Sequence, residues 1–104
     1  MKEKTMRRVV ITGLGIVSSI GNNSKEVLSS LRAGRSGITS NADMIEHGFR
    51  SQVAGDIKLD VKDFVDKRTL RFMGPGAAYA HIAMEQAITD AGLEENEISN
   101  FRTG

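Results

Sequence analysis

The feature that most constrains the fold is a long, alanine-rich helix predicted over residues 75–91. Pro75 stands at a favourable first-turn position, and Gly92 supplies a C-terminal stop. Small and apolar side chains recur on one face at three- and four-residue spacing: Ala77, Ala80, Met84, Ala87, Ile88 and Ala91. Others lie off this row: Ala78, Ile82 and Ala83. We therefore expect close approach of another helix or a sheet, and burial on more than one side.

Two further segments have clear patterns. The unbroken β-branched run at residues 8–12 predicts a strand covered on both faces, as in a parallel sheet. Residues 24–33 predict a helix, because Asn23 is a suitable N-cap, Glu26 follows at capping-box spacing and Gly34 can end it. One strand and two long helices do not close a layered architecture, so the sequence predicts an incomplete α/β fold.

The stretch between these helices has a weaker pattern and predicts a loop-rich excursion. A turn at residues 36–37 leads into a short extended piece, and residues 43–47 form a single helical turn that ends at Gly48. Residues 51–55 are a candidate strand. After residue 93 the chain is acidic and shows no terminating element.

Charge and cysteine content exclude several classes of protein. The chain has 14 Lys and Arg residues and 13 Asp and Glu residues, a formal net charge of +1, which argues against a dedicated nucleic-acid-binding protein. It has no cysteine, which excludes a disulfide, a thiolate metal site and a cysteine nucleophile. No apolar run is long enough to span a membrane, and the N-terminal stretch lacks a signal-peptide cleavage site. We expect a cytoplasmic protein, with residues 1–5 as a flexible extension before Met6.

A glycine motif after the predicted strand admits two interpretations. Glycines at positions 13 and 15 allow a backbone to approach a pyrophosphate at a helix N-terminus, which makes a nucleotide-binding unit one hypothesis. The pattern is a poor match, because Ser18 occupies the third position and the next helix begins only near Ser24. The favoured interpretation is a tight turn in which glycine adopts a positive φ.

The histidines, serines and carboxylates do not form the pattern of a catalytic or metal site. His47 and His81 are far apart in the sequence and lack ligand spacing. The serines have no nearby base and fit caps and turns. Three carboxylates fit a solvated face: Asp60, Asp63 and Asp66. We therefore predict no catalytic residue, cofactor site or metal site in this chain.

One cluster of charge predicts a binding surface. On a helix, Lys67 and Arg71 are four residues apart and Arg68 and Arg71 three, so three positive charges share a face. An ordinary solvated face is the simpler interpretation. The functional interpretation is a docking surface for an acidic protein or a phosphate-bearing group, to which arginine offers a planar pair of donors.

Taken together, these segments resemble the N-terminal portion of a β-ketoacyl-acyl-carrier-protein synthase, specifically the type I enzymes of bacterial fatty acid synthesis. The segments that carry the resemblance are residues 7–23, 30–38, 49–55, 84–93 and 102–104. The resemblance implies that residues 6–104 are the beginning of the N-terminal domain of a thiolase-like, layered αβαβα fold. The chain is expected to be truncated, and the complete enzyme is implied to be a homodimer.

The resemblance also implies an activity. Enzymes of this family condense an acyl group with malonyl carried on acyl carrier protein, with loss of carbon dioxide, through a cysteine nucleophile and two histidines. Those residues lie after position 104 in the family, and His47 and His81 do not correspond to them, so this chain alone is expected to be inactive. The residues that the resemblance assigns to carrier-protein binding are Arg50, Lys67, Arg68 and Arg71. It implies no cofactor and neither nucleic acid nor membrane as a partner.

A second hypothesis belongs to another class: a stand-alone, non-catalytic module that holds an acidic protein through its basic helix face. The two hypotheses differ in the core that they require. A truncated enzyme leaves its first strand and last helix uncovered, so the isolated chain is expected to be poorly soluble or to self-associate. A stand-alone module has a complete core of its own.

Overall fold

The computed structural model describes residues 5–104, so the extension predicted before Met6 lies almost wholly outside the described residues. The helices, in chain order, are α1 (Ser24–Ala33), α2 (Ala42–Glu46), the 3-10 helix η1 (Val61–Asp63), α3 (Lys67–Leu70), α4 (Pro75–Ala91) and α5 (Glu95–Ile98). The strands are β1 (Ile38–Ser40) and β2 (Val53–Gly55), an antiparallel pair in which Ile38 lies opposite Gly55. Within residues 5–104, no helix combines the length and the apolar character that a membrane crossing requires.

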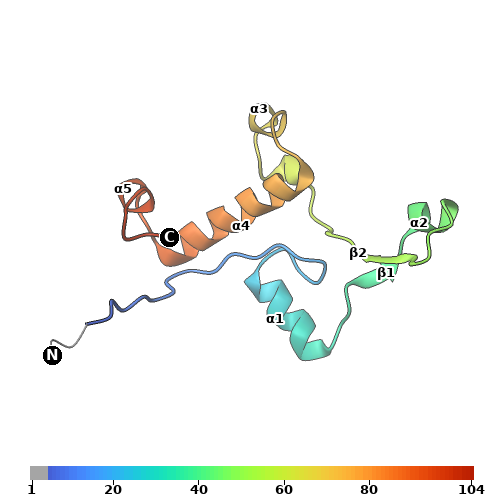
Figure 1. Cartoon of the computed structure of the whole chain (residues 1–104), viewed down its shortest axis with the longest axis horizontal. Coiled ribbons are helices and arrows are strands. Elements are labelled where there is room, and N and C mark those ends of the chain that lie inside the picture. The colour runs from blue at the N-terminus through green and yellow to red at the C-terminus, as the bar shows by residue number, and fades with distance from the viewer. Residues whose placement is uncertain (1–4) are drawn as a thin grey trace.

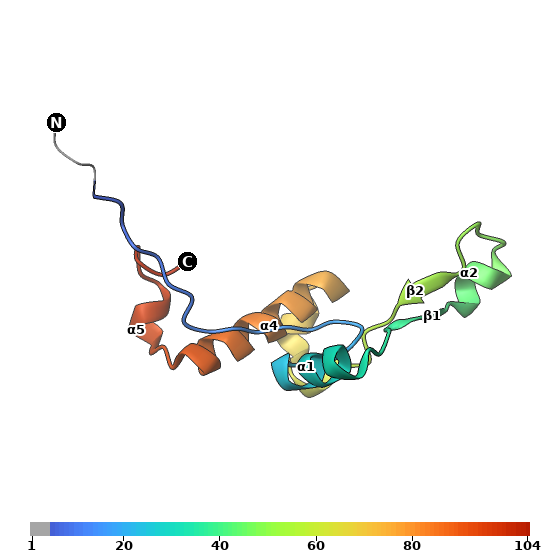
Figure 2. The same cartoon turned by 90° about the horizontal axis from the view of Figure 1, so that it is seen from below.

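The chain is drawn out around α4 rather than folded into a sphere. In Figures 1 and 2 the segment that precedes α1 runs alongside α4, and the β1–β2 pair with α2 extends away from both. The Cα radius of gyration is 18.6 Å, whereas a compact domain of about 100 residues has a radius near 13 Å. The chain alone therefore encloses little interior.

The ends of α1 and α2 confirm the local sequence predictions. The Asn23 side chain accepts a hydrogen bond of 2.9 Å from the N–H of Glu26, which is the predicted N-cap of α1. Gly34 then ends the helix in the left-handed conformation, with φ 67°. Gly48 follows α2 in the same conformation, with φ 66°. The predicted extended pieces before and after α2 are β1 and β2.

The ends of α4 also match their prediction. Pro75 is the first residue of the helix, where its missing N–H costs no intrahelical bond. Gly92 ends the helix with φ 68°, and the N–H of Leu93 donates to the carbonyl of Ile88 at 3.3 Å. This bond is the Schellman arrangement that a glycine followed by an apolar residue predicts.

The strand predicted at residues 8–12 is wrong: these residues are extended but belong to no sheet. Among the described residues the one sheet consists of β1 and β2, and residues 8–12 pair with neither strand. Val9 is 91% exposed and Ile11 is 92% exposed. The β-branched side chains favour an extended backbone by themselves, whereas a strand requires a second backbone to pair with.

Gly13 and Gly15 have a purpose that neither interpretation from the sequence predicted. A Cβ atom at Gly15 would overlap the carbonyl oxygen of Ala83, and one at Gly13 would overlap that of Ala87. The glycines therefore let this backbone lie directly on α4. Neither has a positive φ, so the predicted tight turn is wrong. Because α4 fills the space beside both, the nucleotide-binding interpretation is wrong as well.

Side-chain hydrogen bonds hold the same segment on α4. The N–H of Leu14 donates to Asp90 Oδ2 at 3.0 Å, and the N–H of Ile16 donates to Gln86 Oε1 at 3.1 Å. Gln86 Nε2 in turn donates to the carbonyl of Asn22 at 2.7 Å. Two polar side chains of α4 thus satisfy backbone groups over residues 14–22 that would otherwise need water or a neighbouring strand.

The core is small and lies where α4 meets the segment around η1. Its buried apolar residues are Leu59, Val65, Ala78 and Ile82. The alanine row predicted from the sequence is therefore partly wrong, because Ala77 and Ala80 are exposed while Ala78 and Ile82 are buried. The expectation that α4 is buried on more than one side is confirmed, since the glycine segment covers a second side.

The chain after α4 contains a short helix, α5, where the sequence analysis expected no terminating element. Glu94 and Glu97 form a reciprocal capping box: the Glu94 side chain accepts from the backbone of Glu97, and the N–H of Glu94 donates to Glu97 Oε2 at 3.1 Å. The hydroxyl of Thr103 donates to the carbonyl of Glu97 at 2.7 Å. A glutamate in the N-cap position is an unusual cap, and the acidic run masked this signal.

Candidate functional site

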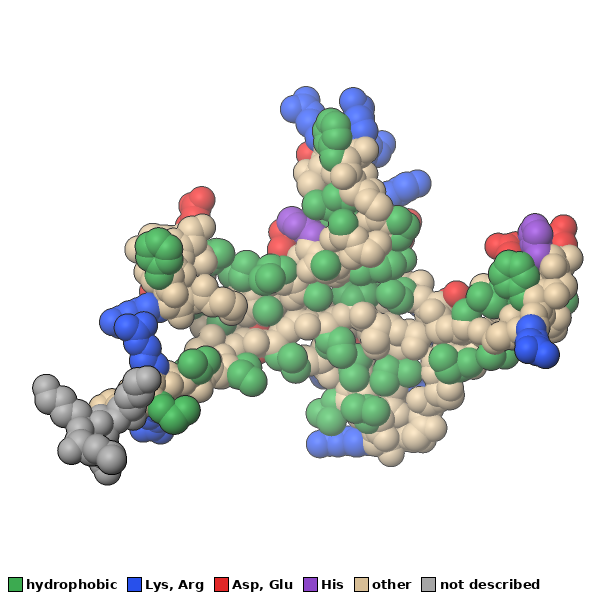
Figure 3. Space-filling model, in the orientation of Figure 1, with side chains coloured by type: hydrophobic (Ala, Val, Ile, Leu, Met, Phe, Trp, Pro, Cys, Tyr) green, Lys and Arg blue, Asp and Glu red, His purple; other side chains and the backbone are tan. Residues whose placement is uncertain are grey.

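Three of the four residues predicted to bind a partner lie together on α3. Lys67 and Arg68 belong to the helix, and Arg71 is its C-cap, with an N–H that donates to the carbonyl of Lys67 at 3.2 Å. This bond places Lys67 and Arg71 one helical turn apart on the same side. We call these three residues the α3 basic surface. Figure 3 shows Lys and Arg side chains gathered at the top of the molecule, where Figure 1 places α3.

The charges of the α3 basic surface are not neutralised within the described part of the chain. All three residues are exposed. Among residues 5–104, the one contact within 4 Å between a basic side chain and a carboxylate joins His81 Nε2 on α4 to Glu85 Oε1, 3.2 Å apart. The surface therefore presents three positive charges with no carboxylate in direct contact with them in the described chain, although Asp66 stands beside them as the N-cap of α3.

Apolar packing positions this surface. Leu70 and Met73, on either side of Arg71, pack against the core of Leu59, Val65 and Ile82. They fix the short helix against α4, although four residues are too few to be helical by themselves. Phe72 lies between them in sequence, yet its side chain is 88% exposed. The basic surface thus carries an exposed aromatic ring beside its cations.

Arg50, the fourth predicted residue, lies apart from the other three. It is exposed in the connection between α2 and β2, and Figures 1 and 2 show this region well away from α3. Within this chain the four residues therefore form two separate surfaces. Sequence spacing located the cluster of three, but it could not place Arg50 relative to them.

The two histidines are also kept apart. His47 follows α2, and its Nδ1 lies 2.8 Å from the carbonyl oxygen of Asp43, whereas His81 pairs with Glu85 on α4. In the described range 5–104, no three His, Asp or Glu side chains come together as metal ligands do. The histidines are thus occupied in local contacts of their own helices.

A polar pocket between the start of α1 and the chain after it was not predicted from the sequence. Five of its eleven lining residues are serines, Arg35 and Lys58 are among the others, and its volume is about 320 Å³. The serines were predicted to serve in caps and turns, and Ser18 does so: its Oγ accepts from the N–H of Ile20 at 3.3 Å. The only signal in the sequence was the density of serines on both sides of α1, which does not by itself indicate a cavity.

Comparison with known proteins gives consistent matches to one family. Residues 6–104 match the family described as Beta-ketoacyl synthase, N-terminal domain. The chain is 57% identical over 99 residues to 3-oxoacyl-(acyl-carrier-protein) synthase 1 of Haemophilus influenzae, covering 95% of this chain and 24% of the relative. It is 55% identical over 95 residues to the protein of the same name from Escherichia coli, covering 91% and 23%.

A solved structure gives the same result for the fold. The ishigamide ketosynthase/chain length factor superposes with a TM-score of 0.77 and 36% sequence identity, over 89% of this chain and 23% of that one. The chain thus spans about a quarter of the length of the proteins that it matches. The prediction of an α/β fold, as the N-terminal part of a thiolase-like architecture, is confirmed. Because residues 6–104 match the model of this N-terminal domain, the chain belongs to the β-ketoacyl synthase family.

Proposed function

We propose that this chain acts as the N-terminal part of a 3-oxoacyl-acyl-carrier-protein synthase, an acyltransferase that condenses an acyl group with malonyl on acyl carrier protein. The observation that carries this proposal is the 57% identity to such an enzyme over 95% of the chain. The chain has no cysteine, so the nucleophile of the condensation comes from the rest of the enzyme. The homodimer and the cytoplasmic location implied by the resemblance belong to this proposal.

The contribution of these residues is scaffold and docking. The segment over residues 13–22 is fixed on α4 by two glycine contacts and by the hydrogen bonds of Gln86 and Asp90. We propose that the α3 basic surface and Arg50 bind the acidic carrier protein. Three exposed, unneutralised cations beside an exposed Phe72 support this role, since such a surface offers both charge attraction and an apolar contact.

The stand-alone module would use the same basic surface but would need a complete core. The extended residues 9–11 and the radius of gyration of 18.6 Å favour the enzyme. The apolar side chains of residues 9–11 remain in water in this chain, and they contribute hydrophobic stabilisation only when a further part of the enzyme covers them.

An exchange experiment tests the proposed function. We expect that residues 6–104, placed in the H. influenzae synthase in exchange for its matching segment, support condensation of acyl and malonyl groups on acyl carrier protein. At 57% identity most core positions keep their volume and pattern. Product formation is measured with purified chimera. The 104-residue chain alone and the synthase without the segment serve as controls, both expected to be inactive.

A folded chimera without condensing activity would contradict the proposal. Circular dichroism and thermal unfolding of the chimera separate this outcome from a failure to fold. Condensation by the isolated chain would contradict the assignment of the nucleophile to the rest of the enzyme.

A further inference from the structure

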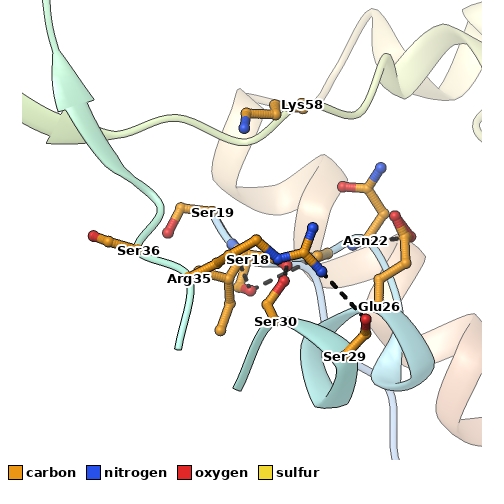
Figure 4. A pocket seen from close by; sticks show the side chains of 11 residues that line it. Ser18, Ser19, Asn22, Glu26, Ser29, Ser30, Arg35, Ser36 and Lys58 are labelled. Atoms are coloured by element: carbon orange, nitrogen blue, oxygen red, sulfur yellow. Dashed lines mark hydrogen bonds between the residues drawn. The ribbon is translucent and has the colours of Figure 1, made fainter. Parts of the chain in front are cut away.

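The polar pocket beside α1 is formed by three segments that lie apart in the sequence. Residues 18–22 form one wall, Glu26, Ser29 and Ser30 of α1 form the second, and Arg35, Ser36 and Lys58 close the third. Figure 4 shows Arg35 directed toward Ser29 of α1, with Lys58 on a separate segment of the chain. The volume of about 320 Å³ is sufficient for a small ligand.

Positive charge dominates this pocket. Neither Arg35 nor Lys58 forms an ion pair among residues 5–104, where the pair of α4 is the one present. The single carboxylate of the lining is Glu26, and its Oε2 accepts from the N–H of Asn22 at 3.4 Å and from the Asn23 side chain at 3.1 Å. These hydrogen bonds hold that carboxylate at the cap of α1, and together with Arg35 and Lys58 it leaves the lining a formal net charge of +1, which still favours an anion.

The serine hydroxyls add hydrogen-bond donors to these charges. Arg35 Nη2 donates to Ser29 Oγ at 3.2 Å, and the N–H of Ile38 donates to Ser36 Oγ at 3.1 Å. Because each oxygen is already an acceptor, its own O–H remains able to donate. Ser30 differs, since its hydroxyl donates to the carbonyl of Ile20 at 2.6 Å and supports the wall instead.

We propose that this pocket binds a phosphate group, either as inorganic phosphate or as a small phosphate monoester. The guanidinium of Arg35 offers paired donors to phosphate oxygens, the ammonium of Lys58 adds a second charge, and Ser29 and Ser36 supply hydroxyl donors. The site lies outside the α3 basic surface and does not depend on the proposed condensing function.

Titration of the chimera that carries residues 6–104 with inorganic phosphate tests this site. Binding is followed by isothermal titration calorimetry at constant ionic strength, with chloride exchanged for phosphate. We expect a saturable binding heat. The double substitution Arg35→Gln with Lys58→Gln is expected to weaken binding about tenfold or more, since a loss of 1.4 kcal/mol corresponds to a factor of ten. A parallel titration with glycerol 3-phosphate distinguishes an ester from free phosphate.

The matched control removes two cations from α1 that do not line the pocket, Lys25→Gln with Arg32→Gln. It leaves the phosphate affinity unchanged if the pocket is the site. Equal weakening by both double variants would overturn the proposal, because it would show attraction to net charge alone. The absence of saturable binding heat in the unsubstituted chimera would overturn it as well.

Discussion

Replacing Lys67 and Arg71 together by glutamate is expected to raise the KM for acyl carrier protein about tenfold or more at low salt, with kcat nearly unchanged. The substitution is made in the chimera that carries residues 6–104. Both residues are exposed, lie one turn apart and have no carboxylate partner in the described chain. Reversing two charges that face an acidic partner replaces attraction by repulsion while leaving the reacting groups alone.

The effect should shrink as salt rises, because exposed charges are screened over about 10 Å at 0.1 M ionic strength. The control is Lys25→Glu with Arg32→Glu on α1, which changes the net charge equally at another exposed face. Steady-state kinetics at two salt concentrations provide the measurement. An unchanged KM in the α3 variant, or an equal increase in the control, would remove the docking assignment.

The second large effect is expected at Gly15. Gly15→Ala in the chimera is expected to destabilise the protein by about 3 kcal/mol, at the upper end of the usual cost of overpacking. The added methyl group would overlap the carbonyl oxygen of Ala83, and backbone on both sides prevents a small adjustment. The free energy of unfolding is measured by urea denaturation, with the midpoint and slope compared with those of the unsubstituted chimera.

Gly76→Ala is the matched control, because it makes the same chemical change in the first turn of α4. A Cβ atom there meets nothing within 4 Å, and alanine is favoured over glycine in a helix by up to about 1 kcal/mol. We therefore expect opposite signs for the two substitutions. Equal stability changes would show that Gly15 does not hold the N-terminal segment against α4.

The candidate site was partly predictable. The three-residue and four-residue spacing of Lys67, Arg68 and Arg71 predicted a shared face, and the structure places them on one short helix. Their exposure follows from local helical geometry once Leu70 and Met73 pack, partly buried, against the core. The position of Arg50 was not predictable, because it depends on the path of β1 and β2 away from α4. Whether all four bind the carrier protein stays a prediction.

The fold divides in the same way. The caps at Asn23, Gly34 and Gly92 were predicted because a helix end is determined by residues within a few positions of it. The run at residues 8–12 predicted a strand correctly only as far as its extended backbone. Its pairing depends on a second strand brought alongside it, and among the described residues neither β1 nor β2 pairs with it.

By itself, the sequence determined where the long helices begin and end, which cations share a face, and the family resemblance. The tertiary structure alone decided that Gly13 and Gly15 lie against α4, and that Ala78 and Ile82 are buried. It also decided that Asp90 and Gln86 accept hydrogen bonds from the N–H groups of Leu14 and Ile16. The physical reason is the distance along the sequence over which each interaction acts. Capping and charge spacing act over three or four residues, whereas close packing depends on which distant backbone arrives at a given face.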